Sequence, residues 1–330
     1  MTTNNTLLEV RGLRTAFHTE AGAWLAVDGV DLSVERGEIV GLVGESGSGK
    51  SVTGFSLLGL IDPPGEVVAG EVIFDGTDLR TLSEEQLRQL RGNRIAMIFQ
   101  DPLMTLNPVL RVKEQMMEAI HTHYPKTPKR EAEQRCLEAL AMVGIPAPES
   151  RIDNYPHEFS GGMRQRVAIA IAMLNQPELI IADEPTTALD VTIQGQILYQ
   201  MQTLCRKNNT AMIWITHDLG VVAELADKVA VMYAGRIVEY GPVSEILAAP
   251  RHPYTKGLLQ SMPGTAKPGS RLAQIDGMAP TLTSREVGCT FRPRCLHALD
   301  QCAQSVPPQT IEGARYFRCF APIPALQEAV

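Results

Sequence analysis

The sequence predicts an α/β fold with a mainly parallel sheet, and three features point to it. Short apolar runs typical of buried strands alternate with helical stretches along most of the chain. One of these runs leads directly into a glycine-rich loop that is followed by a helical segment. After about residue 250 the composition shifts to Pro, Gly and Cys with little periodicity, which marks a separate appendage.

The individual elements follow from these patterns. The strands expected in the parallel sheet are at residues 39–43, 95–99, 179–182, 211–216 and 229–233. Short antiparallel strands are expected at 7–10, 29–34 and 70–74, and the longer helices at 52–61, 113–121, 129–143 and 167–174. Ser83-Glu-Glu-Gln86 is a capping box that opens a short helix, which Gly92 ends.

Two boundaries divide the chain. Strand signals are almost absent between the second and third parallel strands, so we expect a helical subdomain inserted at about residues 101–166. The change of composition places one domain at residues 1–249 and a small Cys-rich C-terminal domain at residues 250–330.

Composition and charge narrow the classes of protein that fit. The 330 residues are 44% hydrophobic and fill a sizeable core, yet no apolar run approaches the roughly 20 residues that span a bilayer. The first residues lack the features of a secretory signal, so we expect a cytoplasmic address. The net charge of −7, with scattered Lys and Arg, argues against nucleic acid as a partner. Cys136 and Cys205 fall in amphipathic stretches and are expected to be buried.

A phosphate-binding loop is the most specific signal in the chain. It matches G-x-x-x-x-G-K-S and consists of Gly44, Glu45, Ser46, Gly47, Ser48, Gly49, Lys50 and Ser51. A loop of this kind between a strand and a helix turns backbone N–H groups toward the phosphates of a nucleotide. Lys50 can reach the β and γ phosphates, and the Ser51 hydroxyl can bind Mg²⁺.

Two further motifs support a nucleotide site. The strand at 179–182 ends in Asp183 and Glu184, at the carboxyl edge of the sheet where ligands bind in such folds. Asp183 would hold Mg²⁺, and Glu184 would act as general base on the attacking water. Ser160, Gly161 and Gly162 precede a helix and form a second anion-binding N-terminus.

In this order, the motifs resemble the ATP-binding-cassette (ABC) family over essentially the whole chain. They are the phosphate loop, Gln100 in Phe99-Gln-Asp-Pro102, Ser160-Gly-Gly-Met163, the segment 179–184, and Thr216-His217-Asp218. The resemblance implies a P-loop ABC ATPase core with a mainly parallel sheet, an antiparallel β subdomain and the helical subdomain. ATP and Mg²⁺ are the implied ligands.

The resemblance also implies roles for single residues. Gln100 would sense Mg²⁺ and the attacking water, and His217 would contact the γ-phosphate. Phe17 would stack on adenine, and 188–190 resembles the loop that communicates across the dimer. In the family the signature at Ser160 completes the ATP site of the opposite subunit. It usually reads Leu-Ser-Gly-Gly-Gln, so Met163 removes any contact that the glutamine amide makes.

Within the family, three segments resemble the ATPases of peptide importers: residues 99–108, 155–163 and 251–255. This implies a subunit that hydrolyses ATP to power import of dipeptides or oligopeptides. It also implies a second ABC ATPase subunit, with two membrane-spanning permease subunits and an extracytoplasmic substrate-binding protein. The second ATPase is expected to be a related but different chain, although one sequence does not decide between such a chain and a copy of this one. The expected location is the cytoplasmic face of the inner membrane.

Other readings stay open at this point. The same subfamily includes carriers of nickel, glutathione and other small solutes, so the resemblance indicates the solute less directly than the mechanism. A soluble ABC ATPase of DNA repair or translation would carry long coiled coils or two cassettes, and the sequence has neither. A module that binds ATP without hydrolysis would lack some of Lys50, Asp183, Glu184 and His217, and all four are present.

Four cysteines crowd the end of the chain: Cys289, Cys295, Cys302 and Cys319. Free thiols, disulfides, a zinc site and an iron–sulfur cluster all compete for this spacing. A reducing cytoplasm disfavours disulfides, and structural zinc sites favour closer Cys pairs. Four thiolates among arginines suit a [4Fe–4S] cluster. The resemblance to peptide importers, whose terminal cysteines hold such a cluster, points the same way.

Overall fold

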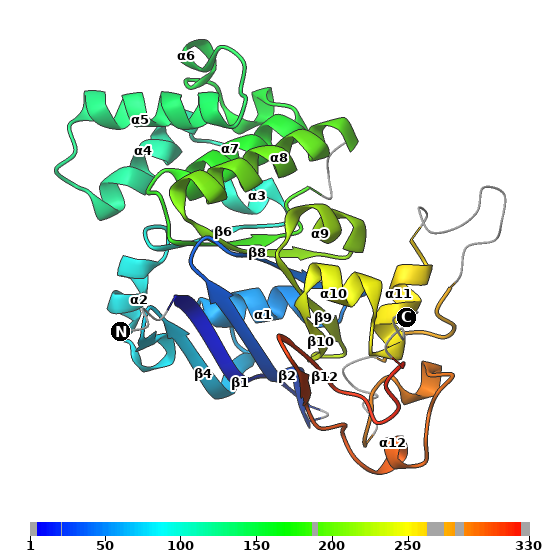
Figure 1. Cartoon of the computed structure of the whole chain (residues 1–330). Helices are drawn as coiled ribbons and strands as arrows, with labels where there is room; N and C mark the ends of the chain where they lie inside the picture. The colour runs from blue at the N-terminus through cyan, green and yellow to red at the C-terminus, as the bar shows by residue number, and fades with distance from the viewer. Residues whose placement is uncertain (1–4, 21, 187–190, 263–273, 281–286, 325–330) are drawn as a thin grey trace. The chain divides into compact units, whose positions relative to one another are not determined.

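The computed structural model describes residues 5–20, 22–186, 191–262, 274–280 and 287–324 (Figure 1). The contacts within it divide the chain into two compact units. Unit 1 consists of the residues up to Leu7, Glu35–Glu38 and Thr81–Ile213, and unit 2 of Leu8–Val34, Ile39–Arg80 and Trp214–Val330.

Unit 1 is a layer of helices on parallel strands. Strands β6 (Ile95–Ile98) and β7 (Leu179–Asp183) pair in parallel with Ile98 opposite Ala182, and β8 (Ala211–Thr216) begins in this unit. The remaining elements are α2 (Glu84–Leu90), α3 (Pro102–Thr105), α4 (Val112–His123), α5 (Lys129–Met142), α6 (Pro148–Arg151), η2 (Pro156–Glu158), α7 (Gly161–Met173) and α8 (Val191–Asn208). Helix α7 packs on β6 and on α5, and Figure 1 shows these green helices together.

Unit 2 holds two sheets. The first has the antiparallel order β2-β1-β4-β5 and consists of β2 (Gly22–Glu35), β1 (Thr6–Thr19), β4 (Gly65–Phe74) and β5 (Thr77–Asp78). In the second, β3 (Ile39–Val43) pairs in parallel with β9 (Lys228–Tyr233), and β10 (Arg236–Pro242) pairs antiparallel with β9. Its helices and the short turn after β5 are α1 (Lys50–Leu57), η1 (Leu79–Thr81), α9 (Leu219–Leu225) and α10 (Val243–Ala248).

The five expected parallel-type strands are all present within a residue or two, and the capping box is confirmed. Ser83 Oγ accepts from Gln86 N at 3.3 Å, and Gln86 Oε1 accepts from Ser83 N at 2.9 Å. The antiparallel strands were predicted too short. β1 runs through Gly12, whose φ of +57° accompanies a register shift between Arg11 and Arg14, so a bulge continues the strand beyond residue 10, where the predicted strand ends.

The tail after residue 250 contains regular elements that the sequence does not predict. They are α11 (Pro253–Gln260), η5 (Arg292–Arg294), α12 (Gln301–Gln304), β11 (Thr310–Glu312) and β12 (Arg315–Phe317). β12 extends the second sheet of unit 2, since Glu239 and Tyr240 of β10 lie opposite Phe317 and Tyr316. Three-residue strands are too short to give an alternating pattern, and this one forms because the edge of β10 supplies its hydrogen bonds.

None of the helices in the described ranges is long and apolar enough to cross a membrane. The expectation for the buried cysteines is confirmed, because Cys136 on α5 and Cys205 on α8 are both fully buried. Burial raises the pKa of each thiol to about 12.

Candidate nucleotide site

The phosphate loop follows the fully buried strand β3 and leads into α1, as the sequence predicts. Two of its glycines are required by space. A Cβ at Gly44 would lie 2.1 Å from Met232 O, and one at Gly49 would lie 2.4 Å from Ala26 O. Gly49 also has φ of +102°, a conformation that L side chains rarely adopt. The loop is therefore held against its own sheet in a shape that other residues cannot take.

The polar groups of the loop are placed to receive an anion. Lys50 Nζ donates to Gly44 O at 2.8 Å and to Glu45 O at 3.0 Å, so the ammonium lies over the loop and is buried. The N-cap of α1 is Gly49, which brings no side chain to its first N–H groups. Ser48 Oγ is buried and has no hydrogen-bond partner among the described residues. Ser51 is half-buried on the first turn of α1. The loop therefore offers donors that suit phosphate and a hydroxyl that suits Mg²⁺.

In unit 1, the ends of two neighbouring strands bring Gln100 and Glu184 together. Because β6 and β7 are parallel, the residues that follow them emerge at the same edge. Gln100 Nε2 donates to Glu184 Oε2 at 3.2 Å, while Asp183 at the end of β7 is 3% exposed. Glu184 has φ of +43°, so the chain turns sharply at this carboxylate.

Two more predicted residues lie in unit 2 with the phosphate loop. His217 is exposed and follows β8 directly, and the next residue, Asp218, caps α9 by accepting from Gly220 N at 2.8 Å. Phe17 lies near the end of β1 opposite Gly65 of β4, where a Cβ on that glycine would come within 2.8 Å of Phe17 Cε1. The ring is half-buried, so one part of it stays accessible.

The signature motif forms the start of a helix in unit 1. The helix predicted at 167–174 begins earlier, because Ser160 is the N-cap of α7 and its Oγ accepts from Met163 N at 3.3 Å. Gly161 and Gly162 are therefore the first helical residues. Ser160 and Gly161 are exposed, and a Cβ on Gly161 would meet nothing within 4 Å. The loop at 188–190 lies outside the described residues.

Two residues that touch the phosphate loop were missed at the level of sequence. Tyr254 Oη accepts from Glu45 N at 3.0 Å, and Arg294 Nη1 donates to Glu45 Oε2 at 2.8 Å. Tyr254 lies within the segment 251–255 that resembles peptide importers, and Arg294 lies next to Cys295. Neither position carries a pattern that points to a loop so distant along the chain.

Comparison with known proteins places these motifs in a family. The ABC transporter family matches residues 27–187, and the family described as oligopeptide/dipeptide transporter, C-terminal region, matches residues 238–302. The dipeptide transport ATP-binding protein DppD of Haemophilus influenzae is 49% identical over 317 residues, 96% of each chain. The chain belongs to the ABC transporter family.

Other similar proteins agree with this assignment. The oligopeptide transport ATP-binding protein OppD of Bacillus subtilis is 51% identical over 304 residues, which cover 92% of this chain and 85% of the relative. A solved dimeric structure of an ATP-binding cassette in a post-hydrolysis state, bound to ADP and Pi, has a TM-score of 0.66 at 27% identity and covers 72% of this chain and 99% of its own. The chain thus has the P-loop ABC ATPase fold with mixed α/β sheets, and it is an ATPase whose phosphate loop suits ATP and Mg²⁺.

The expected [4Fe–4S] cluster of this ABC ATPase is not supported by the placement of its cysteines. Cys289, Cys295 and Cys319 are half-buried and Cys302 is buried, all as free thiols. Burial above all, together with the charges of the three other thiols, raises the pKa of Cys319 to about 12, so the four share one neighbourhood. Among the described residues, however, no three Cys, His, Asp or Glu side chains form a group that could hold a metal ion. The side chains as placed therefore do not fit the cluster.

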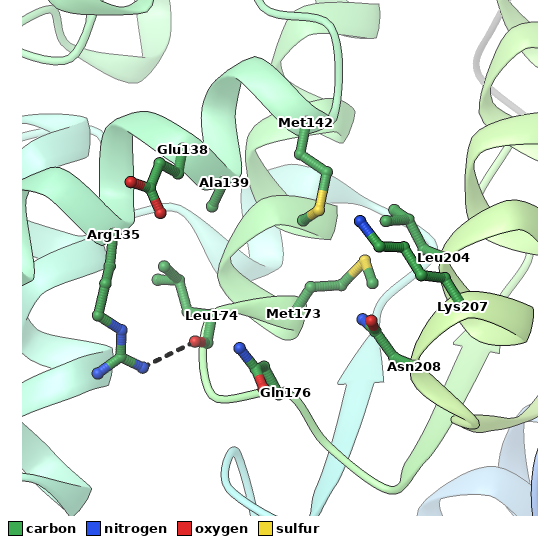
Figure 2. A pocket seen from close by; sticks show the side chains of 10 residues that line it. All are labelled: Arg135, Glu138, Ala139, Met142, Met173, Leu174, Gln176, Leu204, Lys207 and Asn208. Atoms are coloured by element: carbon green, nitrogen blue, oxygen red, sulfur yellow. Dashed lines mark hydrogen bonds between the residues drawn. The ribbon is translucent and has the colours of Figure 1, made fainter.

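A separate hollow in unit 1 contains none of the predicted site residues. It measures about 240 Å³ and lies between the ends of α5, α7 and α8 (Figure 2). Met142, Met173 and Leu204 point into it, and Arg135 Nη2 at its rim donates to Leu174 O at 2.9 Å. Its lining offers no paired acid and base and no anion-binding loop, so we assign it no part in the ATPase reaction.

Proposed function

We propose that the chain is the ATP-hydrolysing subunit of a membrane ABC transporter that imports dipeptides or oligopeptides. The observation that carries the proposal is the match of residues 238–302 to the C-terminal region of oligopeptide/dipeptide transporters. This region lies beyond the match to the ATP-binding core at 27–187, so it separates peptide transporters from ABC ATPases in general. Identities of 49% and 51% to dipeptide and oligopeptide transport proteins support the same solute class.

At the site, each residue has a proposed role. The backbone of the loop and Lys50 bind the phosphates of ATP, and Ser51, Gln100 and Asp183 hold Mg²⁺ directly or through water. Glu184 accepts a proton from the attacking water, and the amide of Gln100, 3.2 Å from that carboxylate, orients it. His217 contacts the γ-phosphate, and Phe17 stacks on adenine.

The signature at Ser160, Gly161 and Gly162 acts on ATP bound by a second subunit. The support for this is the exposure of Ser160 and Gly161 at the start of α7, a helix N-terminus that can receive an anion. The second subunit is a related but different ABC ATPase chain. ATP closes the two subunits, and hydrolysis with phosphate release reopens them.

The remaining partners follow from the transporter class. Two membrane-spanning permease subunits receive the chain at the cytoplasmic face of the inner membrane, and an extracytoplasmic protein delivers the solute. The loop that carries Gln100 contacts the permeases, and residues of about 101–166 form the helical subdomain. Residues 1–249 form the ATPase domain, and residues 250–330 form a Cys-rich C-terminal domain.

The four terminal cysteines remain a proposed [4Fe–4S] site. Cys289 N donates to Cys302 O at 2.9 Å, which places two of the four cysteines side by side, and Arg292 and Arg294 lie between Cys289 and Cys295. To hold the cluster, the four side chains would have to turn toward one point. Purification without oxygen tests this directly. Bound iron with a broad absorption near 400 nm would support the cluster, and the lack of both would exclude it.

The solute is tested by uptake in cells that lack rival transport systems. Labelled dipeptides, longer peptides, glutathione and nickel are offered to cells that carry either the wild-type chain or its Glu184→Gln variant. We expect loss of peptide uptake alone in the variant. Intact peptide uptake with loss of glutathione or nickel uptake would keep the ATPase mechanism and overturn the peptide assignment.

A further inference from the structure

The C-terminal part of the chain reaches directly into the phosphate loop. Glu45, the second residue of the loop, is held at two atoms: its N–H donates to Tyr254 Oη at 3.0 Å, and its carboxylate accepts from Arg294 Nη1 at 2.8 Å. The side chain of Arg294 is 6% exposed and Tyr254 is fully buried. All three residues belong to unit 2.

Arg294 is fixed by several bonds at once. Its Nε donates to Asp276 O at 2.9 Å and its Nη2 to Ile275 O at 3.3 Å, while its guanidinium lies 5.8 Å from the centre of the Tyr233 ring. A lysine has a single nitrogen and cannot make these bonds together. The guanidinium is therefore held in place before it meets Glu45.

An aromatic cluster joins the same regions. The ring of Tyr254 lies 4.6 Å from that of Tyr233 and 5.4 Å from that of Phe291, which lies two residues after Cys289. Tyr233 ends β9, the strand that pairs with β3, from which the phosphate loop starts. Packing thus links the cysteine segment, residues 289–302, to the base of the loop.

The charge of Glu45 gives this contact a consequence for nucleotide binding. Its carboxylate lies within a loop that must receive a polyphosphate, and an unpaired anion there would repel the ligand. Arg294 neutralises that carboxylate through a hydrogen-bonded ion pair in which the arginine side chain is buried and that of Glu45 is 28% exposed.

We propose that Arg294 and Tyr254 are positioning residues that hold and neutralise the phosphate loop, and that the cysteine segment is thereby coupled to the nucleotide site. This inference rests on the assignment of ATP to the phosphate loop. Because coupling between two sites is reciprocal, ATP binding stabilises residues 289–302 as much as their packing strengthens ATP binding.

The first test measures the Kd of a fluorescent ATP analogue with Mg²⁺ for the purified full-length chain. We expect Arg294→Gln to weaken binding about 10-fold, because it leaves the Glu45 carboxylate unpaired. Tyr254→Phe keeps the ring and removes only the acceptor of the Glu45 N–H, and about 3-fold weaker binding is expected. It serves as the second variant where Arg294→Gln fails to fold.

Arg315→Gln is the matched control. Arg315 is 11% exposed, donates to Ala249 O at 2.9 Å and pairs with Glu312 at 3.0 Å, so its loss resembles that of Arg294 in burial and bonding. None of its bonds named here involves the phosphate loop. We expect the Kd of Arg315→Gln to stay within about 2-fold of the wild type, even if Arg315→Gln and Arg294→Gln lower the melting temperature similarly.

The double variant Glu45→Gln/Arg294→Gln tests whether the unpaired charge of Glu45 causes the loss of affinity. Removing the carboxylate together with its partner should restore most of the affinity that Arg294→Gln loses. Hydrogen exchange supplies an independent readout: ATP should slow exchange at residues 289–302 in the wild type, and much less in Arg294→Gln. Affinity within 2-fold of the wild type in both Arg294→Gln and Tyr254→Phe, with no ATP effect on exchange, would overturn the inference.

Lys50→Ala separates this failure from failure of the nucleotide site itself. If the wild type binds the analogue and Lys50→Ala does not, the phosphate loop is the site, and unchanged binding in the two positioning variants rejects only the coupling. If Lys50→Ala binds as tightly as the wild type, the assignment of the loop is wrong and the inference falls with it.

Discussion

The chain contains two glycine-rich helix starts that can bind phosphate, and they are built differently. At α1 the cap is Gly49 in a left-handed conformation, Lys50 is buried over the loop, and Tyr254 and Arg294 hold Glu45. At α7 the cap is Ser160, which is exposed, and space around Gly161 is open. The first is therefore a cradle completed by its own unit, and the second is a half-site that presents its donors to solvent.

From this difference we predict that the α1 start binds ATP by itself and that the α7 start does not. A helix N-terminus offers a partial positive charge, but affinity requires a fixed loop and a cation that water does not screen. The α1 start has both. At the α7 start, Arg164 Nη1 donates to Phe159 O at 3.0 Å, but Ser160 and Gly161 are exposed, which agrees with the proposal that this start acts on ATP held by another subunit.

The largest expected effect comes from Gly49→Ala, which is compared with the same substitution at Gly161 in the other helix start. Gly49→Ala should abolish ATP binding, because φ is +102° and the new Cβ would lie 2.4 Å from Ala26 O. Gly161→Ala adds a Cβ that meets nothing within 4 Å, so the fold and the ATP affinity of the phosphate loop should persist. Binding of a fluorescent ATP analogue to both variants checks this. Equal losses in both would remove the distinction between a packed and an open start.

The second effect concerns hydrolysis alone. Ser160→Asp keeps an N-cap acceptor of similar strength, so α7 should stay intact, but it adds a negative charge where a phosphate would approach. We expect ATP hydrolysis to fall about 100-fold, as for loss of a transition-state donor, while the Kd for ATP stays unchanged. Steady-state hydrolysis and analogue binding measure the two quantities. A weakened Kd would instead show that the signature contributes to its own subunit's site.

A smaller effect is the pH dependence of stability next to Tyr254, one of the two residues that hold the phosphate loop at the α1 start. His252 caps α11 by accepting from Tyr254 N at 3.0 Å, and burial lowers the pKa of its imidazole to about 3. Between pH 6.5 and 3 the unfolded chain binds a proton there that the folded chain does not. The free energy of unfolding therefore decreases as the pH is lowered from 6.5, by about 1.4 kcal/mol per pH unit for one proton.

His252→Asn retains an N-cap acceptor and cannot titrate. Its free energy of unfolding should fall less steeply than that of the wild type between pH 6.5 and 5, as measured by urea denaturation. Parallel slopes for the two proteins would contradict the buried neutral imidazole.

The smallest effect lies in unit 1, next to the strand that carries Asp183. Glu178 precedes β7 and accepts from Arg94 and Arg36, and hydrogen bonding by Arg94 above all lowers its pKa. Glu178→Gln should cost about 1 kcal/mol at pH 7, given partial exposure of the pair. Because folding lowers the pKa of Glu178, the stability difference between the wild type and Glu178→Gln should be fully present above the pKa of this carboxyl in the unfolded chain. It should vanish as the pH falls through the lower pKa of the folded chain. Denaturation at pH 7 and at acid pH compares the two.

Most of the core could be predicted from sequence, because its signals are local. The strand β3, the glycine spacing and Lys50 identify the phosphate loop, and the capping box at Ser83 fixes the start of α2. The start of α7 was missed because two glycines disfavour a helix, whereas Ser160 caps it and the packed helix behind it carries the first turn.

The long-range supports could not be predicted. Arg294 and Glu45 are 249 residues apart, and nothing in either segment specifies the other. β12 is three residues long and becomes a strand only beside β10. Likewise, the crowding of four cysteines near the end of the sequence does not determine whether their side chains converge.

The central claim is that the two helix starts serve different subunits, and mixing two inactive variants tests it most directly. Lys50→Ala lacks a working cradle and Ser160→Asp lacks a working half-site. In this assay the purified chain takes the place of its related partner by pairing with itself. The two variants are therefore mixed at concentrations where wild-type hydrolysis per subunit rises with concentration, which shows that this self-pairing occurs. If the motifs act across a dimer, each mixed dimer holds one intact site, and the mixture should recover roughly a quarter of the wild-type rate. A rate no higher than the sum of the two variants alone would contradict the claim.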